Sequence, residues 1–317
     1  MSSVQTNHSS NVAFVFPGQG SQAVGMGLDL YKGSKAARAI FDEVDDALGS
    51  NVSKIFFEGP EDELRLTVNT QPGIMTVSLA CLATMNEVLG TEMMPVPSLV
   101  AGHSLGEYTA LVASGALSAG DGVKLVRERS RLMQYASELT EGGMAAILGM
   151  EETILSSICI ETGTEISNVN TADQIVISGE KQAVEKAMEI ASERGARRTV
   201  QLPVGGAFHS KLMGPAQEGL AKVVSELNFQ TPHTPIVANC TGNPLTTIDE
   251  IKDELVSQLC SCVRWKETVD YMTGFGINKY YEVGPGKVLA GLVKRINENA
   301  DAINVSDLES INSLRSP

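Results

Sequence analysis

Short apolar runs alternate with helical patterns along most of the chain. The first run, "NVAFVF" at 11–16, stops at Pro17 and Gly18. Another, "SLVAG" at 98–102, is followed after three residues by the helical segment "GEYTALVASGAL". Short apolar runs bounded by Gly or Pro are typical of buried strands, and strands alternating with helices are typical of a sheet covered by helices. The pattern therefore predicts an α/β core.

The order of elements changes between residues 141 and 208. Strand "MAAILGM" is followed by a helix, two strands joined by a Thr-Ala-Asp turn, a second helix and strand "RRTVQLPV". This β-α-β-β-α-β order is that of a ferredoxin-like unit. We therefore predict a large α/β subdomain from residues 1–140 and 209–317, with residues 141–208 inserted as a ferredoxin-like small subdomain. We expect the tail after about residue 299 to be frayed.

Composition and charge narrow the classes of function. The 317 residues are 43% hydrophobic and 20% charged, as in ordinary globular proteins, and a formal net charge of −14 makes nucleic acid a poor partner. The beginning of the chain does not resemble a signal peptide, and no run of about 18 apolar residues is evident, so we expect no membrane partner and a cytoplasmic protein. The five cysteines are scattered without metal-site spacing, which predicts reduced, mostly buried thiols and no metal.

A candidate nucleophile lies between the strand at 98–102 and the helix that follows it. Gly102, Ser104 and Gly106 have the G-x-S-x-G spacing of a nucleophile elbow, in which glycines allow a sharp turn that exposes the serine oxygen. The motif alone is weak, because Gly and Ser are common in turns. Its position between an apolar strand and a helix favours Ser104 as a catalytic nucleophile.

The general base can be sought by elimination, because a serine hydroxyl needs a base within hydrogen-bonding reach and the chain has four histidines. His8 lies in the N-terminal tail, and His233 lies in a turn bracketed by prolines. His103 is adjacent to Ser104, and neighbouring side chains at a tight turn point apart. His209 remains, at the end of a strand where a structural role is the common alternative, and we predict that it is the base.

The reaction of an acyl group at Ser104 would also need backbone N–H donors for the developing oxyanion. The N–H of Leu105 is one candidate, because it follows the elbow serine and opens the helix. The loop "FPGQGSQ" can supply the second donor at Gln19, since Gly18 and Gly20 allow its backbone to approach a ligand. A simple strand-to-helix turn is the alternative, and a phosphate-binding loop is disfavoured because no Lys-Ser/Thr pair follows.

Arg129 occupies the apolar face of the predicted helix "GVKLVRERSRLMQYA" at 122–136. Leu125 and Leu132 lie in one apolar stripe with position 129 between them, and Val126 and Met133 form the neighbouring stripe. An inward guanidinium must find an anion, because a buried unpaired charge is costly. The anion is either a core carboxylate in a buried ion pair or a substrate carboxylate held by two hydrogen bonds. With Ser104, the second alternative suggests an acyl group that carries its own carboxylate.

Motifs along nearly the whole chain, from about residue 11 to 296, resemble the malonyl-CoA:acyl carrier protein transacylase family of fatty acid synthesis. They include "FVFPGQGSQAVGMG", "TQPGIMTVSLA", "AGHSLGEYTALVASG", "LVRERSRLMQ", "NVNTADQIVISG", "GAFHSKLM" and "YYEVGPGKVLAGLVKR". The resemblance implies an α/β-hydrolase-like large subdomain, a ferredoxin-like small subdomain and an active site between them. It also implies transfer of malonyl from malonyl-CoA, through a malonyl-serine, to the phosphopantetheine thiol of holo acyl carrier protein, with no cofactor.

The same resemblance assigns roles to individual residues of this chain. It implies that Ser104 is the nucleophile, that His209 is the base and that Arg129 binds the malonyl carboxylate. It places the oxyanion donors at the N–H groups of Gln19 and Leu105.

Two further residues are assigned by the resemblance alone. Gln71, in "NTQPGIM", corresponds to a glutamine that lines the family's pocket, and Gln258 would orient His209 through its backbone carbonyl, with no acidic triad member expected. One departure concerns Ala207-Phe208-His209, where many bacterial members have Pro-Ser-His. The Ala-Phe-His form also occurs in polyketide synthase acyltransferase domains that select malonyl, and a phenylalanine there would crowd an α-methyl group.

Three alternatives remain open from the sequence. A serine hydrolase or thioesterase would use the same elbow and histidine but would have no need of an inward Arg129. A free-standing malonyl acyltransferase of a polyketide pathway would share all the motifs. A non-catalytic binding protein on this scaffold is disfavoured, because both Ser104 and His209 are present. We expect a monomer.

Overall fold

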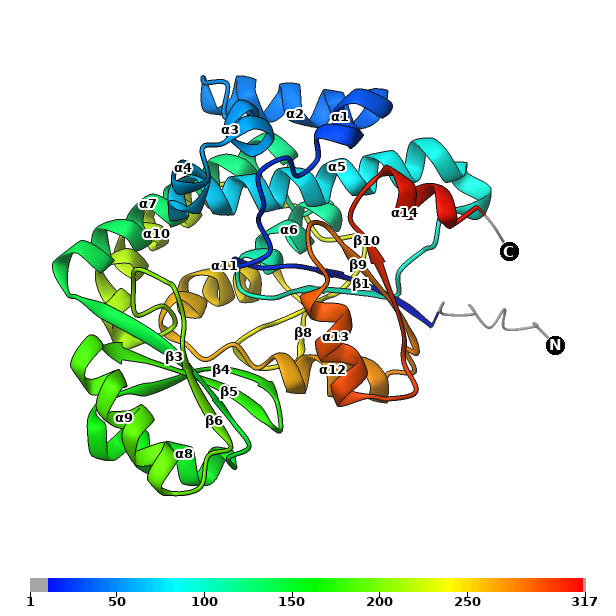
Figure 1. The fold of residues 1–317 in the computed structure, drawn as a ribbon. Coiled ribbons are helices and arrows are strands. Elements are labelled where there is room, and N and C mark those ends of the chain that lie inside the picture. The colour runs from blue at the N-terminus through cyan, green and yellow to red at the C-terminus, as the bar shows by residue number, and fades with distance from the viewer. Residues whose placement is uncertain (1–10, 316–317) are drawn as a thin grey trace.

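Strand β1 (Val12–Phe16) lies in the middle of the larger of two sheets in a computed structural model that describes residues 11–315 (Figure 1). The strand order is β10-β9-β1-β2-β7-β8, and all neighbours are parallel except β7 and β8. The other strands of this sheet are β2 (Leu99–Gly102), β7 (Ile236–Val237), β8 (Pro244–Leu245), β9 (Lys279–Val283) and β10 (Asp301–Val305).

The two faces of this sheet are covered by different helices, because successive strand residues point to opposite sides. Phe14 and Phe16 belong to one apolar cluster, whereas Ala13 and Val15 belong to the cluster on the opposite face. Helices α12 (Trp265–Gly274) and α13 (Val288–Ile296) cover the Ala13 face. The helices that contribute to the Phe14 cluster are α1 (Leu28–Gly33), α2 (Lys35–Leu48), α3 (Ser53–Glu58), α4 (Glu61–Arg65), α5 (Thr67–Met93), α6 (Leu105–Ala113), α7 (Ala119–Leu139), α10 (Gly214–Glu226), α11 (Ile248–Ser257) and α14 (Leu308–Ser313).

Helix α5 is the central helix of this layer and carries an apolar surface on nearly all sides. It is long and apolar enough to cross a membrane by length and composition, with a mean hydropathy of 1.3, so the sequence-based expectation overlooked one candidate span. In the fold, 67% of that apolar window is buried inside the protein. Neighbouring helices α2 and α7 pack against it, as expected for a core helix.

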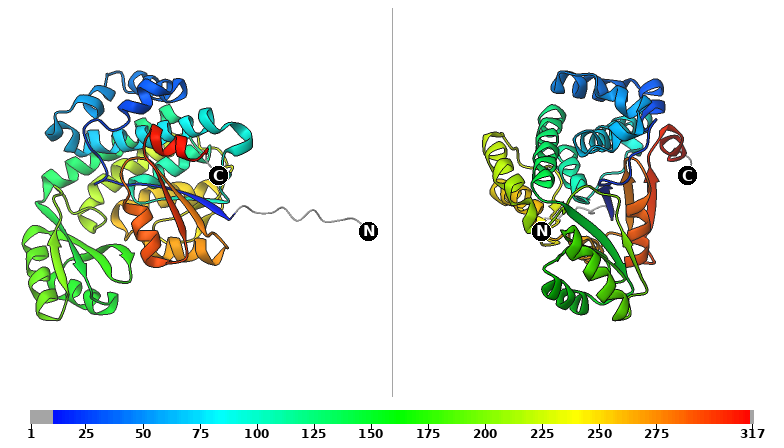
Figure 2. Two further views of the ribbon diagram at one scale, coloured as in Figure 1. Left: turned by 45° about the vertical axis from the view of Figure 1, so that its right-hand side comes forward. Right: turned by 60° about the vertical axis from the view of Figure 1, so that its left-hand side comes forward.

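The smaller sheet forms a separate lobe with helices α8 (Glu152–Thr162) and α9 (Lys181–Glu193) (Figure 2). Its antiparallel strands have the order β4-β5-β3-β6. Together with the β-α-β-β-α-β chain order, this is the ferredoxin-like arrangement. The strands are β3 (Gly142–Leu148), β4 (Glu165–Thr171), β5 (Gln174–Glu180) and β6 (Arg198–Gln201). The exact subdomain boundaries, 140/141 and 208/209, stay predictions.

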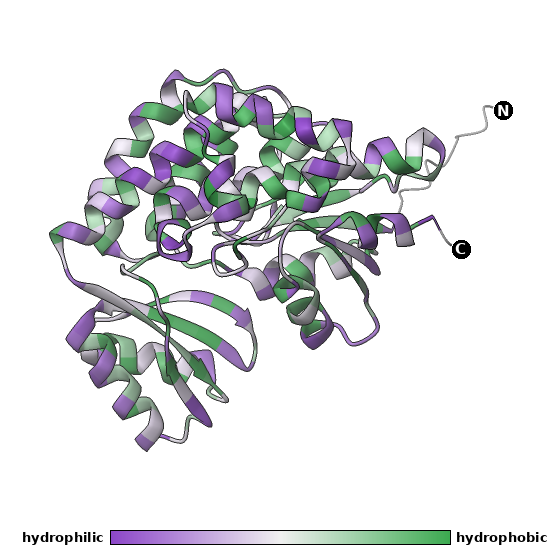
Figure 3. Cartoon of the chain, turned by 45° about the horizontal axis from the view of Figure 1, so that its top comes forward, coloured by the Kyte–Doolittle hydropathy of each residue, from purple (hydrophilic) through white to green (hydrophobic). Residues whose placement is uncertain are grey.

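In both lobes, apolar residues are concentrated in the sheet, and the outer helices carry both polar and apolar residues (Figure 3). The small lobe has its own apolar cluster, in which Ile147 and Ile177 of the sheet meet Leu155 and Ile158 of α8 and Val184 of α9. The opposite face of the small sheet contributes Met144, Ala146 and Val176 to the large apolar cluster that includes Phe14, so the two lobes share this core and also line a common cleft.

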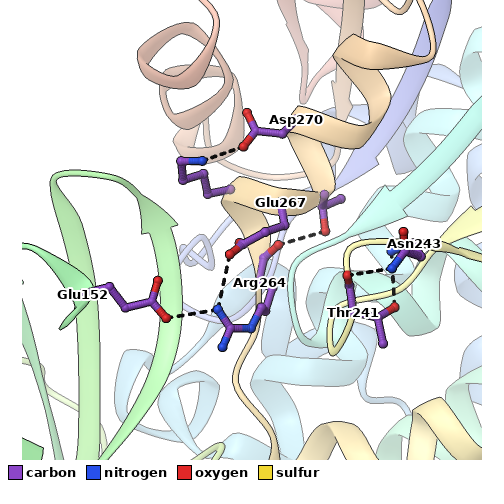
Figure 4. A network of polar contacts seen from close by, with 8 residues as sticks. Glu152, Thr241, Asn243, Arg264, Glu267 and Asp270 are labelled. Atoms are coloured by element: carbon purple, nitrogen blue, oxygen red, sulfur yellow. Dashed lines mark hydrogen bonds and ion pairs between the residues drawn. The ribbon is translucent and has the colours of Figure 1, made fainter. Parts of the chain in front are cut away.

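A segment of the large subdomain joins the two lobes next to α12. Val263 extends the edge of the small sheet: its N–H donates to the Ser167 carbonyl at 2.8 Å, and its carbonyl accepts the Val169 N–H at 2.9 Å. The adjacent Arg264 pairs with Glu152 at the start of α8 at 3.0 Å (Figure 4). These contacts fix the small lobe to the segment that follows α11.

Two expectations from the sequence were wrong. The tail after residue 299 is not frayed within the described chain, because residues 301–305 form β10 at the sheet edge and residues 308–313 form α14. Val305 and Ile311 are fully buried there. The cysteines are free, as expected, but three of the five are only partly buried. Burial raises the pKa of Cys260 to about 11, so its thiol remains protonated at neutral pH.

Phe41 of α2 packs in a cluster of aromatic rings in the core. Phe41 is fully buried, with its ring 5.0 Å from that of Phe57 and 5.7 Å from that of Tyr31. Phe41→Ala should lower the free energy of unfolding by about 3–5 kcal/mol, because it removes apolar contacts and leaves a cavity. The control is Phe275→Ala, where the side chain is 50% exposed and the expected loss is below about 1 kcal/mol. Chemical denaturation followed by circular dichroism measures both, and equal losses would contradict the prediction.

Candidate active site

The turn between β2 and α6 places Ser104 at the edge of the large sheet. Ser104 has φ 50° and ψ −103°, a conformation that a non-glycine residue seldom adopts and that is common at functional sites. A Cβ atom on Gly102 would lie 1.8 Å from the Gly106 carbonyl carbon, and one on Gly106 would lie 2.0 Å from the Phe16 carbonyl oxygen. Both positions therefore require glycine, because the helix start packs directly on strands β1 and β2.

Asn239, which was not predicted from the sequence, holds this turn through hydrogen bonds to its backbone. The Ser104 backbone N–H donates to Asn239 Oδ1 at 2.7 Å, and Asn239 Nδ2 donates to the Gly102 carbonyl at 2.7 Å. Asn239 is fully buried just after β7, 135 residues along the chain from Ser104. No local sequence pattern marks this contact, because it arises only where β2 and β7 become neighbours.

His209 lies directly against the candidate nucleophile. Ser104 Oγ and His209 Nε2 are 2.8 Å apart, and His209 Nδ1 is 2.8 Å from the backbone carbonyl oxygen of Gln258, the first residue of 3₁₀ helix η2 (Gln258–Cys260). Because a carbonyl can only accept, Nδ1 carries the proton and Nε2 is left to accept the Ser104 hydroxyl proton. The structure thus brings together three residues that the sequence analysis singled out.

The other histidines lie elsewhere. His103 points into the small lobe, where its Nε2 is 2.9 Å from Asn170 Oδ1, and its ring lies 5.7 Å from that of Trp265. His233 lies between α10 and β7, beside Gly115 and the C-terminal end of α6, where its N–H donates to the Ser114 carbonyl at 2.7 Å. His8 lies outside the described residues. Among the described histidines, His209 is the one within hydrogen-bonding distance of Ser104 Oγ.

The surroundings of His209 keep its ring neutral. Burial and the nearby Arg129 guanidinium lower the pKa of His209 to about 3. Both effects disfavour the charged imidazolium. A neutral imidazole is the form that can accept a proton, so His209 is available as a base throughout the neutral range.

Arg129 is completely buried on α7 and reaches the same point from the opposite side. Its Nη1 donates to Gln71 Oε1 at 2.7 Å, and its Nη2 donates to Gln258 Oε1 at 2.9 Å and to Ser104 Oγ at 3.1 Å. Its guanidinium also lies over the Tyr108 ring at 4.8 Å. No ion pair between residues 11 and 315 includes Arg129, so the alternative of a buried ion pair with a core carboxylate is wrong.

The predicted oxyanion donors are the backbone N–H groups of Gln19 and Leu105. Neither donates to another residue of the described chain, and both residues line the same cavity as Ser104. The side chain of Gln19 is held next to Gln71, with its Oε1 3.5 Å from Gln71 Nε2. Their role as an oxyanion hole stays a prediction.

A cavity of about 580 Å³ opens above Ser104 and His209, between the two lobes. Both subdomains line it, among others with Gln71 of α5, Phe208 next to His209, and Met144, Asn168 and Val176 of the small sheet. Residues 11–315 contain no group of three or more His, Cys, Asp or Glu that could hold a metal ion. The groups that meet at the floor of this cleft are the Ser104 hydroxyl, the neutral His209 ring and a buried guanidinium that has no carboxylate partner in the described chain.

A nucleophile elbow with its histidine in a cleft between an α/β sheet and a ferredoxin-like lobe defines the class of serine-dependent acyltransferases. The family model of the acyl transferase domain matches residues 13–314. A malonyl CoA-acyl carrier protein transacylase of Bacillus subtilis strain 168 is 44% identical over 307 residues, covering 95% of each chain. This chain therefore belongs to the malonyl-CoA:acyl carrier protein transacylase family.

Solved structures have the same fold. A crystal structure of an acyl-carrier-protein S-malonyltransferase from Bartonella henselae matches with a TM-score of 0.91 and 44% identity, covering 95% of this chain and 97% of that one. A malonyl-transacylase in complex with a type II polyketide synthase acyl carrier protein matches with a TM-score of 0.91 and 38% identity, covering 96% and 98%. The α/β-hydrolase-like and ferredoxin-like architecture predicted from the sequence is confirmed.

The low pKa of His209 predicts how its imidazole ring responds to pH. Because the folded-state pKa of about 3 lies below the ordinary value of about 6.5, the ring should stay neutral as the pH falls from 8 to 5. The unfolded chain binds this proton first, so His209 contributes stability that is present above about pH 6.5 and is lost as the pH falls. Imidazole carbon and nitrogen shifts assigned by comparison with His209→Gln report the titration. A midpoint near pH 6.5 would contradict the prediction.

Proposed function

We propose that this chain transfers the malonyl group from malonyl-CoA to the phosphopantetheine thiol of an acyl carrier protein, through a malonyl ester of Ser104. The observation that carries the choice of acyl group is the buried Arg129 guanidinium, which has no carboxylate partner in the described chain and contacts Ser104 Oγ at 3.1 Å. Its acceptors are amide and hydroxyl oxygens, which a carboxylate can replace with stronger, charge-assisted hydrogen bonds. The malonyl carboxylate would then lie next to the carbon that reacts.

The first half of the reaction follows from the hydrogen bonds around Ser104. His209 Nε2 takes the hydroxyl proton while Ser104 Oγ forms a bond to the thioester carbonyl carbon. The N–H groups of Gln19 and Leu105 stabilise the oxyanion, the carbon–sulfur bond breaks, and the imidazolium returns its proton to the departing CoA thiolate. The Gln258 carbonyl, which accepts a hydrogen bond from the Nδ1–H group, keeps the ring oriented through both transfers.

The second half reverses these steps with the carrier protein's thiol as the attacking group. His209 takes the thiol proton, the new thioester forms, and the proton returns to Ser104 as its ester bond breaks. One site serves both substrates in turn, which makes the scheme ping-pong. The cavity that opens above Ser104 supports this, since it can admit the pantetheine arm of either substrate.

Phe208 supports malonyl as the acyl group rather than a branched analogue. It precedes the base directly, is 8% exposed and lines the cavity, so its ring occupies space that an α-methyl group would need. Supply of malonyl groups for fatty acid elongation is the role that we propose. A polyketide pathway is the second candidate, because a structurally similar transacylase was solved with a carrier protein of that kind. We propose action in the cytoplasm as a monomer.

The acyl-enzyme can be detected directly. Purified protein mixed with malonyl-CoA, without carrier protein, should gain the mass of one malonyl group, and Ser104→Ala should gain none. Intact-mass spectrometry after acid quenching measures the adduct. Accumulation of free malonate without an adduct would instead favour the hydrolase alternative.

The role of Arg129 is tested by comparing two acyl groups. Arg129→Ala should lower kcat/KM for malonyl-CoA by about 10- to 150-fold, the range expected for loss of a charged hydrogen bond, while the value for acetyl-CoA falls much less. Arg131→Ala is a matched control, because Arg131 lies on the same helix with its side chain 59% exposed and paired with Glu128. Steady-state rates with both thioesters give the ratio. An equal loss for malonyl and acetyl would show that Arg129 does not select the carboxylate.

A further inference from the structure

The reaction described above gives no role to a buried carboxyl group close to Ser104, that of Glu107. Glu107 lies three residues after Ser104 on α6, and none of its side chain is exposed. No ion pair within residues 11–315 includes it. A buried carboxylate without a directly paired cation is costly unless hydrogen bonds compensate for its lost hydration.

Both oxygens of Glu107 accept hydrogen bonds from residues that hold the catalytic groups. Oε1 accepts the backbone N–H of Asn239 at 2.8 Å and the side-chain Nδ2 of Asn239 at 3.2 Å. Oε2 accepts Nε2 of Gln258. Every one of these partners is a donor, which is the arrangement that suits an ionised carboxylate.

These hydrogen bonds determine which way the two amides face. With its Nδ2 turned toward Glu107, Asn239 presents Oδ1 to the Ser104 N–H at 2.7 Å. With its Nε2 turned toward Glu107 and the Ser104 carbonyl, Gln258 presents Oε1 to Arg129 Nη2 at 2.9 Å. Rotating either amide by half a turn would set an N–H group against an N–H group of Ser104 or of Arg129.

We propose that Glu107 is a positioning residue of the acyl transfer reaction, which orients the Asn239 and Gln258 amides by accepting hydrogen bonds on both carboxylate oxygens. The inference rests on the function proposed above. Through Asn239 it fixes the strained turn at Ser104, and through Gln258 it fixes Arg129 and the residue whose carbonyl orients His209. A single carboxylate in the layer beneath the site thus holds the nucleophile, the base and the arginine in one arrangement.

Two charged side chains face Glu107 from other elements: Arg129 on α7 and Glu254 on α11. Burial and the Glu254 carboxylate raise the pKa of Glu107 well above its ordinary range, whereas the N–H donors and Arg129 oppose this change. A protonated Glu107 would need an acceptor for its own O–H, and none of its hydrogen-bond partners presents one in this arrangement. The orientation of the amides therefore favours the ionised form.

Glu107→Gln tests the proposal, because glutamine offers one accepting oxygen and places an NH₂ group against a donor. The matched control is Glu254→Gln, whose Oε1 accepts the Cys240 N–H at 2.8 Å, a hydrogen bond that a glutamine carbonyl can also accept. Rapid quenching with malonyl-CoA gives two quantities for each protein: the fraction of chains acylated and the acylation rate constant of those chains. The rate constant should fall about tenfold or more in Glu107→Gln and stay within about twofold in Glu254→Gln.

A purely structural role would change different quantities. It would lower the thermal midpoint or the fraction of chains acylated but leave the rate constant of the competent chains at the wild-type value, and that result would overturn the proposal. Equal slowing of acylation in Glu107→Gln and Glu254→Gln would also overturn the proposal, because the loss of either buried carboxyl group would then be enough to slow the reaction. If the wild-type protein forms no acyl-enzyme, the proposed function fails and this inference fails with it.

Gln258→Leu provides a second test, and its single-variant measurement does not depend on the folding of Glu107→Gln. It removes the amide but keeps the backbone carbonyl that orients His209. The acylation rate constant should fall. In the double variant Glu107→Gln/Gln258→Leu the combined loss should be smaller than the product of the two single losses, because both changes act on the Gln258 amide. A wild-type rate constant in Gln258→Leu, or fully additive losses in the double variant, would contradict the proposal.

Discussion

The active site depends on how closely the start of helix α6 approaches strands β1 and β2. Gly106 lies against the Phe16 carbonyl so closely that a Cβ atom would be 2.0 Å from that oxygen, and Gly102 has no more room beside Gly106. The chain can leave the strand and enter the helix only through the strained turn at Ser104. That turn places Ser104 at the cavity that Leu105, the first residue of the helix, also lines. Packing of backbone on backbone thus places both a nucleophile and a candidate oxyanion donor.

The electrostatics of the site follow from burial rather than from a carboxylate next to the histidine. His209 is oriented by a neutral backbone carbonyl, and its pKa is lowered by burial and by Arg129. A carboxyl group lies one layer deeper, at Glu107, where it accepts hydrogen bonds from Asn239 and Gln258. This separation leaves the guanidinium without a paired carboxylate at the nucleophile, which suits a substrate that brings its own negative charge.

The small lobe lines part of the cleft, and it is attached to the large subdomain next to the active site. Val263 extends the edge of the small sheet only five residues after Gln258, and Arg264 pairs with Glu152 of the same lobe. His103, next to the nucleophile, reaches Asn170 of the small sheet. The position of the lobe and the orientation of the base are therefore set by one short segment of chain.

The sequence by itself determined the local features of this protein. Strand periodicity, the order of the inserted elements and the G-x-S-x-G turn all depend on neighbours within a few residues, so the α/β core, the small lobe and the inward face of Arg129 could be read directly. The membrane-length helix and the last strand were misjudged, because the tertiary environment decides what covers α5 and what pairs with residues 301–305. Only the tertiary structure could show that Arg129 lacks a carboxylate partner and that Asn239 and Glu107 lie beneath Ser104. Hydrogen bonds between residues more than 100 positions apart exist only once the strands are ordered in the sheet, and no local pattern encodes them.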